Sequence, residues 1–422
     1  MLTILLGLLP VPAPADLAPP ASPPNVVLII SDDQWWGDFG FMGSEDVRTP
    51  HLDALAAESR VFPRGYVPTA LCRASLATLI TGLHPHEHKL TGNDPPRGVE
   101  RARMLEHIEA VETVADHLGA AGYRSLQTGK WWEGNCACGG FTEGMTHGDP
   151  SRGGRHGDEG LRIGRDGMAP ATDFIDACVE DETPFFLWYA PLLPHTPHDP
   201  PERLLETYRV EGVPVSVARY RAMCTLFDET CGELLGHLRE RGVAEDTLVL
   251  FVVDNGWIQR PDGRGYAPRS KRTPYEGGVR TPIMVRWVGR VAPGRVETPV
   301  SSVDVPATIL TACGVDVPAR WPGVDLMGDV ADRGPLFGAA YTHDVVEVGR
   351  PERSLLSRWV LEDPLKLIVH TDPARPAELF DVRADPAEER PLEDPETAAK
   401  LRARLDAWWP AGAAAKGPQR RR

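Results

Sequence analysis

The residues Asn25–Asp33, NVVLIISDD, predict a buried strand that ends on two carboxylates. An apolar run without polar interruption is typical of a strand that helices cover on both faces of a parallel sheet. A second stretch, Thr247–Gly256 (TLVLFVVDNG), has the same form. Because ligands of parallel sheets bind beyond the carboxyl ends of the strands, we expect one cation to be held by Asp32, Asp33, Asp254 and Asn255. Carboxylate and amide oxygens favour calcium or magnesium over zinc.

The rest of the chain alternates predicted strands with predicted helices. Further strands are expected at 122–128, 184–189 and 281–287. Helices are expected at 49–59, 72–83, 111–121, 172–179 and 220–241. This alternation predicts an α/β fold in which helices cover both faces of the sheet.

The pattern changes after about residue 340. Two short strands at 365–369 and 378–381 and a helix at 396–409 predict a small α+β subdomain over residues 341–410. Earlier in the chain, residues 134–170 contain many glycines and little apolar periodicity. So long an irregular stretch indicates either a functional loop or a surface insertion with ordinary polar residues.

Both ends of the chain differ from the predicted globular part. Residues 1–15 contain a short apolar run and a small-residue cleavage site, as in a signal peptide, although no Lys or Arg precedes the run. Residues 16–24 form a Pro/Ala spacer, and residues 411–422 form a basic tail that we expect to be disordered. No other stretch is long and apolar enough to span a bilayer. These features predict an exported protein, periplasmic or secreted, without a membrane span.

Composition limits the kind of partner. The chain has 422 residues and a formal net charge of −15, which argues against a nucleic-acid-binding surface. An acidic protein repels anionic substrates at long range, so an anion site needs local positive charge. Of the seven cysteines, the six other than Cys72 could pair in an exported protein or remain buried thiols. Cys136 and Cys138 lack the second pair that a zinc site requires.

Six segments, in one order, carry a resemblance to a known family. They are Asn25–Gln34, Thr69–His88, Gly129–Gly134, Pro194–Pro201, Val253–Gly256 and Lys271–Pro282. Together they resemble the type I sulfatases of the alkaline-phosphatase-like superfamily. The resemblance implies a mixed, mostly parallel sheet between helices in a catalytic domain at 25–340, and the C-terminal subdomain at 341–410. It also implies hydrolysis of a sulfate ester on a small molecule or a glycan.

The resemblance also implies roles for single residues. Cys72 matches the cysteine that a formylglycine-generating enzyme converts to the nucleophilic formylglycine, and the four strand-end residues match metal ligands, with calcium usual and magnesium possible. Lys130 and Lys271 match sulfate-binding lysines, and His195 matches the histidine that serves the leaving group. The chemistry is consistent, because a cation and two lysines stabilise charge that develops on sulfate oxygens. A histidine can protonate the departing alkoxide.

Two positions depart from the family pattern. Leu76 stands where the signature C-x-(P/A)-S-R has its arginine, and Trp132 stands where the family motif G-K-W-H has its histidine. Both family residues service formylglycine. Arg73 next to Cys72, and His156 or His147 in the irregular stretch, are candidates to fill these roles, with Arg73 and His156 as substrate contacts.

Three hypotheses follow from these departures. In the first, the chain is a divergent sulfatase in which other groups replace the lost ones. In the second, Cys72 stays unmodified, and its thiolate or a metal-bound water attacks a sulfate ester or a phosphate mono- or diester. In the third, the fold binds a sulfated glycan without hydrolysing it. Four tryptophans beside the motifs either stack on a sugar or aryl group or pack in the core: Trp35, Trp36, Trp132 and Trp257.

Overall fold

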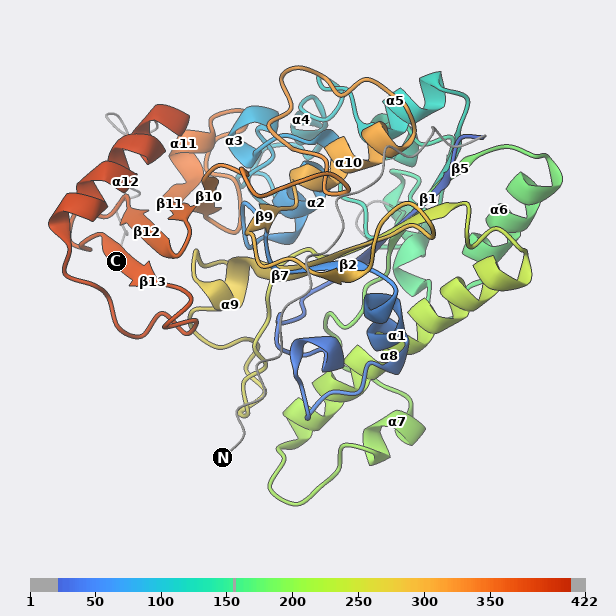
Figure 1. Ribbon diagram of the computed structural model, residues 1–422, viewed down its shortest axis with the longest axis horizontal. Helices are drawn as coiled ribbons and strands as arrows, with labels where there is room; N and C mark the ends of the chain where they lie inside the picture. The colour runs from blue at the N-terminus through green and yellow to red at the C-terminus, as the bar shows by residue number, and fades with distance from the viewer. Residues whose placement is uncertain (1–21, 155–156, 411–422) are drawn as a thin grey trace, which may run out of the picture.

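The computed structural model describes residues 22–154 and 157–410 and contains two sheets (Figure 1). In the described part of the chain the larger sheet has nine strands, in the order β4-β3-β5-β1-β6-β7-β2-β8, with β9 paired to β2. The bounds are β1 Asn25–Ser31, β2 Arg60–Tyr66, β3 Arg124–Gly129, β4 Glu143–Gly144, β5 Phe185–Ala190, β6 Thr247–Val253, β7 Arg280–Arg286, β8 Gly294–Arg295 and β9 Val300–Ser301.

The sheet is mixed but mostly parallel. β1 lies between β5 and β6 and pairs in parallel with both. β3 continues the parallel pairing beyond β5, whereas β7 runs antiparallel to both β6 and β2. The predicted α/β sheet is therefore confirmed.

Strand β1 shows why its apolar run predicts burial on both faces. Successive side chains point to opposite faces of a strand. Val26, Leu28 and Ile30 pack on one face with helices α2 (Cys72–Thr81), α5 (Val114–Ala120) and α10 (Asp304–Ala312). Val27 and Ile29 pack on the other face with α1 (Pro50–Ala57), α6 (Ala169–Glu180) and α8 (Val215–Glu240). Figure 1 shows α2 and α10 above the sheet and α1 and α8 below it.

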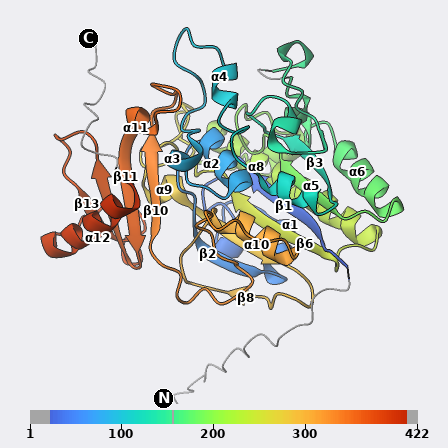
Figure 2. The same ribbon diagram turned by 90° about the horizontal axis from the view of Figure 1, so that it is seen from above.

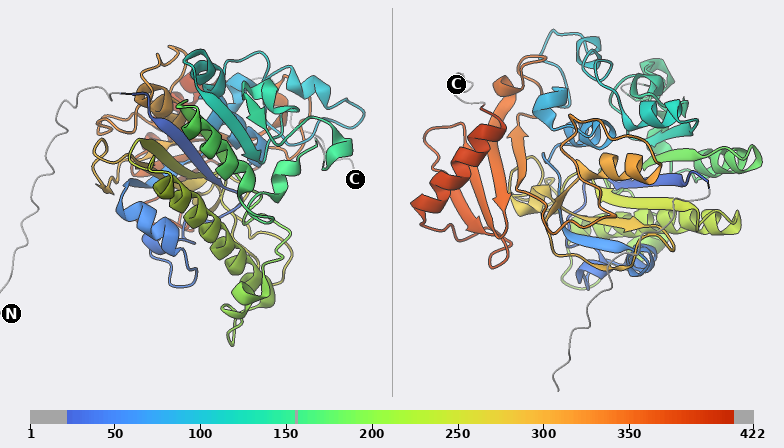
Figure 3. Two further views of the ribbon diagram at one scale, coloured as in Figure 1. Left: turned by 90° about the vertical axis from the view of Figure 1, so that its right-hand side faces the viewer. Right: turned by 45° about the horizontal axis from the view of Figure 1, so that its top comes forward.

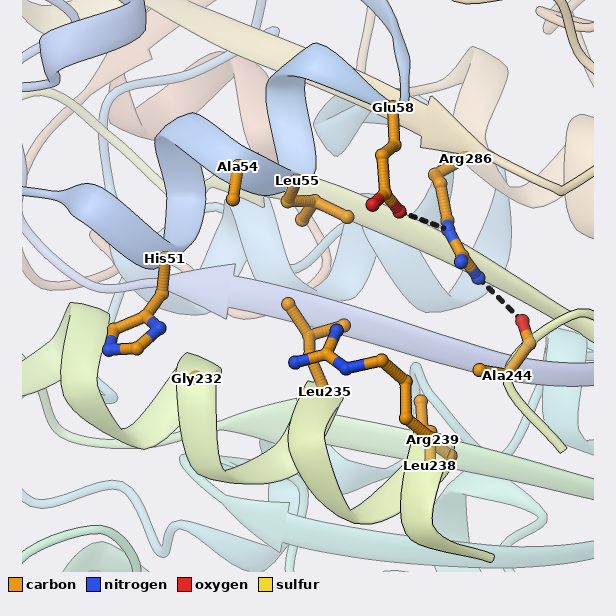
Figure 4. A pocket seen from close by; sticks show the side chains of 10 residues that line it. All are labelled: His51, Ala54, Leu55, Glu58, Gly232, Leu235, Leu238, Arg239, Ala244 and Arg286. Carbon is orange, nitrogen blue, oxygen red and sulfur yellow. Dashed lines mark hydrogen bonds and ion pairs between the residues drawn. The ribbon is translucent and has the colours of Figure 1, made fainter. Parts of the chain in front are cut away.

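Helices α1 and α8 pack closely on the lower face. The Asp228 carboxylate of α8 accepts hydrogen bonds from the backbone N–H groups of His51 and Leu52, which begin α1. A side chain at Gly232 would come within 2.5 Å of the His51 ring, so glycine is required there. Figure 4 shows the small pocket of about 50 Å³ between these helices. None of the predicted site residues lines it.

The second sheet is antiparallel and lies at one end of the molecule (Figures 2 and 3). Its strands are β10 Leu336–Tyr341, β11 Leu355–Glu362, β12 Leu365–His370 and β13 Glu378–Asp381, and α12 (Pro395–Trp408) covers one face. The sheet begins at Leu336, slightly before residue 341, where the sequence predicts the subdomain boundary.

A buried charge cluster joins the two sheets. Lys366 of β12 contacts Glu276 at 3.0 Å and Glu388 at 3.1 Å, and the Tyr66 hydroxyl of β2 donates to Glu276 at 2.9 Å. An apolar cluster that includes Tyr66, Tyr275 and Trp359 surrounds the charges. These contacts fix the small sheet against the large one.

The predicted helices and strands are present, with ends that differ by a few residues, but six strands of the described residues escaped prediction: β2, β4, β8, β9, β10 and β11. Pro63 interrupts the apolar pattern of β2, and the pairing register shifts between Phe62 and Gly65, because proline has no N–H to donate. β10 contains Gly338, where a side chain would meet the Pro68 carbonyl at 2.2 Å, and a glycine inside a strand weakens the strand pattern. The remaining short helices are α3 Pro85–His88, α4 Ala102–Leu105, α7 Glu202–Glu206, α9 Glu276–Val279 and α11 Pro351–Ser354.

Some predictions fall outside the described residues. The proposed signal peptide, most of the spacer, His156 and the tail at 411–422 lie there. The irregular stretch is described apart from residues 155 and 156, and it contains β4 and three short 3-10 helices. All seven cysteines are free thiols in this structure. Within residues 22–154 and 157–410, no helix has the length and apolar character needed to cross a bilayer.

Candidate active site

The carboxyl ends of β1 and β6 bring the four predicted metal ligands together. The backbone N–H of Asp33 donates to the Asp254 carboxylate at 3.0 Å. The Asn255 amide donates to Asp33 Oδ1 at 2.6 Å. Asp33 has φ of 62°, a left-handed conformation that aspartate tolerates better than most residues. This turn directs the Asp33 carboxylate toward β6, and all four side chains are buried.

Two lysines neutralise part of this acidic group. Lys130, which follows β3, places Nζ 2.7 Å from Asp32 Oδ2. Lys271, which precedes α9, contacts the Asp33 carboxylate at 2.6 Å. Both lysines are buried, and each ammonium lies near an indole ring, Lys130 at 5.8 Å from Trp132 and Lys271 at 5.6 Å from Trp257. The lysines are therefore held in place from two sides.

The neighbouring charges shift the pKa values of the two carboxylates Asp33 and Asp254 in opposite directions. Burial raises the pKa of Asp33, but the positive charges of Lys271 and His195 outweigh it and lower that pKa to about 2. Burial and the neighbouring Asp32 raise the pKa of Asp254 well above its usual value. Burial lowers the pKa of Lys130, but the Asp32 carboxylate outweighs it and raises that pKa. The two lysines thus leave one carboxylate, Asp254, without full charge compensation.

Two oxygen atoms identify the place where a cation fits. In the described part of the protein, neither Asp254 Oδ2 nor Asn255 Oδ1 has a hydrogen-bond partner, although both are buried. Buried polar atoms are normally satisfied, and an unsatisfied one needs an explanation. Oxygen acceptors of this kind suit a hard divalent cation. The ligand-type atoms of Asp32, Asp33, Cys72 and His195 also lie within 4.8 Å of one another.

Cys72 is the first residue of α2 and lies against the carboxylates. Its Sγ is 4.0 Å from Asp32 Oδ1 and 3.9 Å from Asp33 Oδ1. Burial raises the pKa of the Cys72 thiol, and the opposing charges of Lys130 and Lys271 do not reverse that rise. Without a cation beside it, Cys72 is therefore mostly in the thiol form, which is not the nucleophilic form.

His195 follows the cis peptide that joins Leu193 to Pro194, at the edge of the same group. Its Nδ1 contacts the Thr196 carbonyl at 2.7 Å, and its Nε2 lies 3.4 Å from Asp33 Oδ2. Since a carbonyl only accepts, Nδ1 carries the hydrogen, and Nε2 faces the carboxylates. Burial lowers the pKa of His195 below the usual 6.5, despite the opposing charge of Asp32.

These groups line one cavity of about 350 Å³. The predicted site residues that line it are Cys72, Lys130, His195 and Lys271. The other lining residues are Asn93, Trp131, Trp132, Gly154, Asp158, Leu161, Leu192 and His343. Trp132 therefore borders the cavity, at one of the two positions that depart from the family pattern. Trp35 and Trp36 line a different surface depression, together with residues of the small subdomain.

Arg73 does not lie among the cavity-lining residues. Its guanidinium is buried and forms two hydrogen bonds with the Glu133 carboxylate, at 2.6 and 2.5 Å. Leu76, one turn farther along α2, packs in the apolar core instead of facing the cavity. No sequence motif predicted the pairing of Arg73 with Glu133, although Glu133 directly follows Trp132. Nor did it point to Asn93 and His343, which belong to no predicted motif.

Comparisons with known proteins identify sulfatases as relatives of this chain. The sulfatase family model matches residues 24–315, and the model described as N-sulphoglucosamine sulphohydrolase, C-terminal, matches residues 266–408. The rat N-acetylgalactosamine-6-sulfatase is 30% identical over 385 residues, across 79% of this chain and 70% of the relative. Human arylsulfatase A is 31% identical over 350 residues, across 71% and 66%.

Solved structures resemble the fold over almost the whole chain. The crystal structure of Ps i-CgsB has a TM-score of 0.75 and 23% identity, and the match covers 92% of this chain and 93% of the other. The complex of another protein with its substrate D-glucosamine-2-N,6-O-disulfate has a TM-score of 0.73 and 19% identity, over 92% and 98%. At these identities the likeness concerns the fold alone.

Proposed function

This chain belongs to the sulfatase family and is a sulfuric ester hydrolase, and from that premise we propose that it cleaves the sulfate ester of a carbohydrate with a divalent cation and a modified Cys72. Carbohydrate sulfates are favoured because several relatives are named for N-acetylgalactosamine 6-sulfate. A structural neighbour binds a disulfated glucosamine. The chain's own geometry supports the cation site, the two lysines and the proton donor.

The observation that carries the proposal is the pair of unsatisfied oxygens on Asp254 and Asn255. With Asp32 and Asp33 they offer oxygen ligands to Ca²⁺, with Mg²⁺ as the alternative. When bound, such a cation would oppose the charge of the sulfate oxygens and lower the pKa of a nucleophile beside it.

Lys130 and Lys271 would hold the sulfate group. Their ammonium groups contact the Asp32 and Asp33 carboxylates. Carboxylates that share their charge with a cation would release the ammonium groups to donate to sulfate oxygens. Fixed donors in a buried site stabilise developing charge strongly, since they need no reorganisation.

His195 would give a proton to the departing alcohol oxygen. Its Nδ1–H is held by the Thr196 carbonyl, so Nε2 is the atom that takes up and releases the proton. A sugar alkoxide is a poor leaving group, and general acid catalysis contributes about 10²–10⁴-fold.

We infer that Cys72 is converted to formylglycine by a formylglycine-generating enzyme, despite Leu76 in the signature. Membership of the sulfatase family supports this conversion. Arg73, paired with Glu133, would position the first turn of α2 rather than touch the substrate. His156 stays a predicted substrate contact outside the described residues.

The remaining predictions form part of the proposal. We keep a catalytic domain at 25–340 and a subdomain at 341–410 as the proposed division, with the metal ligands, Cys72, both lysines and His195 in the first. Residues 1–15 would direct export. A location outside the cytoplasm is also expected for an enzyme that acts on extracellular sulfated glycans.

The test is turnover of 4-nitrophenyl sulfate and 4-nitrophenyl phosphate, with and without chelator, by protein produced with the modifying enzyme. We expect sulfate hydrolysis that EDTA abolishes and Ca²⁺ restores. Faster hydrolysis of the phosphate would favour the phosphohydrolase hypothesis. Binding of sulfated glycans without turnover of any ester would favour the binding hypothesis.

A further inference from the structure

Two polar residues in the catalytic cavity have no part in the proposed reaction. Asn93 and His343 line the cavity together with Cys72, Lys130 and Lys271. Asn93 belongs to the loop after α3, and His343 follows β10 of the small sheet. The small sheet therefore contributes a wall to a cavity whose cation-binding oxygens belong to the large sheet.

The backbone fixes His343 against Asn93. The N–H of Asn93 donates to the His343 carbonyl at 2.8 Å, and the N–H of Val345 donates to the Asp94 carbonyl at 2.9 Å. A side chain at Gly92 would come within 2.8 Å of the Val345 nitrogen, so glycine permits this close approach. The two segments thus meet as a short paired ladder, which holds His343 rigidly.

Asn93 is in turn tied to the helix that carries Cys72. The Arg73 backbone N–H donates to Asn93 Oδ1 at 3.3 Å, and the Arg73 guanidinium donates to the Asn93 carbonyl at 3.4 Å. Asn93 is buried, so its side chain has little freedom. The ion pair between Arg73 and Glu133 completes the support. The position of the His343 ring is therefore set relative to the first turn of α2.

The ring of His343 is oriented on both of its nitrogens. Nδ1 contacts Asp344 Oδ1 at 2.6 Å, and Nε2 lies 3.3 Å from the Asn93 amide nitrogen. Because a carboxylate accepts, Nδ1 carries a hydrogen and Nε2 accepts from the amide. The His343 side chain is 40% exposed, and its contact with the Asn93 amide, at 3.3 Å, is the longer of its two. A ligand hydroxyl that enters between the two side chains would accept from the Asn93 amide and donate to His343 Nε2, which leaves no group unpaired.

We propose that His343 and Asn93 are specificity-determining residues that hydrogen-bond hydroxyl groups of the sugar ring whose sulfate lies between Lys130 and Lys271. The inference rests on the proposed function. Trp132, which lines the same cavity, offers an indole face to the apolar side of that ring. Apolar walls with a few placed polar groups are the usual composition of a site for a small ligand.

The proposal predicts that loss of His343 depends on the substrate. In His343→Ala, kcat/KM should fall about 10- to 100-fold on sugar sulfates, mainly through KM, as expected for lost hydrogen bonds to a positioned group. On 4-nitrophenyl sulfate, which has no sugar hydroxyls, the change should stay within about 3-fold. The sugar panel is N-acetylgalactosamine 6-sulfate, glucosamine 6-sulfate and D-glucosamine-2-N,6-O-disulfate.

His237→Ala is the matched control. His237 of α8 also pairs with an aspartate at 2.6 Å, Asp176, but it does not line the cavity. It should therefore leave both substrates unaffected. Thermal unfolding of both variants checks that each one folds.

Other results would contradict the proposed contacts of His343 and Asn93 or would move the test to a binding measurement. An equal loss on sugar and aryl sulfates, or no loss on either, overturns the proposal. If the wild-type enzyme hydrolyses only the aryl sulfate, the proposed sugar contact is wrong, but the sulfate ester hydrolase activity is confirmed. If the wild type hydrolyses neither kind of ester, the proposed function is wrong, and the sugar contact is tested by calorimetric binding of the same sugar sulfates. Equal affinity of His343→Ala and wild type would overturn the contact. Weaker affinity of His343→Ala would support it.

Discussion

The two sides of the catalytic cavity are built in different ways. The metal-ligand side is the proposed cation site beside the cavity, Asp32, Asp33, Asp254 and Asn255, which extend from the ends of two paired central strands. The cysteine side consists of Cys72 on α2 and Trp132 on the loop after β3, with Arg73 and Glu133 behind them. On the first side the family's residues are all present, whereas on the second side two of them are replaced.

The contrast between the two sides concerns how the fold holds their residues. Strand ends in a central sheet are fixed by the sheet itself, so no neighbour can replace a lost ligand. On the cysteine side, Leu76 joins the apolar core, and a buried ion pair between Arg73 and Glu133 occupies the space behind Cys72. Leu76 is accommodated in the core and Trp132 at the cavity wall, so neither replacement leaves the cysteine side unpacked.

The largest effect is expected on the metal-ligand side. Asp254→Ala removes a buried oxygen ligand, and kcat should fall by at least about 10³-fold because a bound cation contributes several kcal/mol to the transition state. Calorimetric titration with Ca²⁺ should show weaker binding. Asp262→Ala, which changes a surface aspartate paired with Arg260, is the control and should behave as wild type. Retained Ca²⁺ affinity and activity in Asp254→Ala would rule out the proposed cation site.

His195 connects the two sides and should show the next largest effect. His195→Ala should lower kcat on sugar sulfates by about 10²–10⁴-fold, but lower it less on 4-nitrophenyl sulfate, whose leaving group needs no proton. A proton donor must be protonated in the resting enzyme, and burial lowers the pKa of His195 below 6.5. Wild-type kcat/KM on sugar sulfates should therefore fall as the pH rises through the pKa of His195, and the variant should lack this dependence. An unchanged pH profile in the variant would exclude His195 as the acid.

The support of the cysteine side can be tested through stability. Glu133→Gln leaves the buried Arg73 guanidinium without a charged partner, and unfolding free energy should fall by about 3–5 kcal/mol, measured by urea denaturation. Glu229→Gln breaks an exposed ion pair with Arg203 and should cost less than about 1 kcal/mol. Equal effects of the two changes would show that the Arg73 pair does not support the site.

The smallest effect is expected from restoring the family residue at position 132. Trp132→His should raise KM for sugar sulfates about 2- to 10-fold, because a stacking indole contributes about 0.5–1.5 kcal/mol. The value of kcat should stay within a few-fold of wild type, because the surrounding contacts fit tryptophan. A large gain in kcat, measured by steady-state kinetics, would show that the cysteine side is an impaired version of the family's site.

The sequence predicted the residues of the metal-ligand side but not the contacts that support the cysteine side. Apolar runs that end on Asp32, Asp33, Asp254 and Asn255 are a local pattern, and the geometry of parallel sheets turns that pattern into a site. Asn93 and His343 are 250 residues apart, and their contact depends on a loop path and on strand β10, neither of which leaves a periodic signal. The pairing of Arg73 with Glu133 likewise arises from packing of α2 against the loop after β3.

The chemical state of Cys72 tests the account most directly. Mass spectrometry of the peptide spanning residues 69–83, from protein produced in a host with the modifying enzyme, reads that state without an assay of activity. We expect Cys72 to have lost its sulfur and to carry an aldehyde, although Leu76 replaces the signature arginine. An intact thiol in protein that still hydrolyses sulfate esters would contradict the proposed formylglycine.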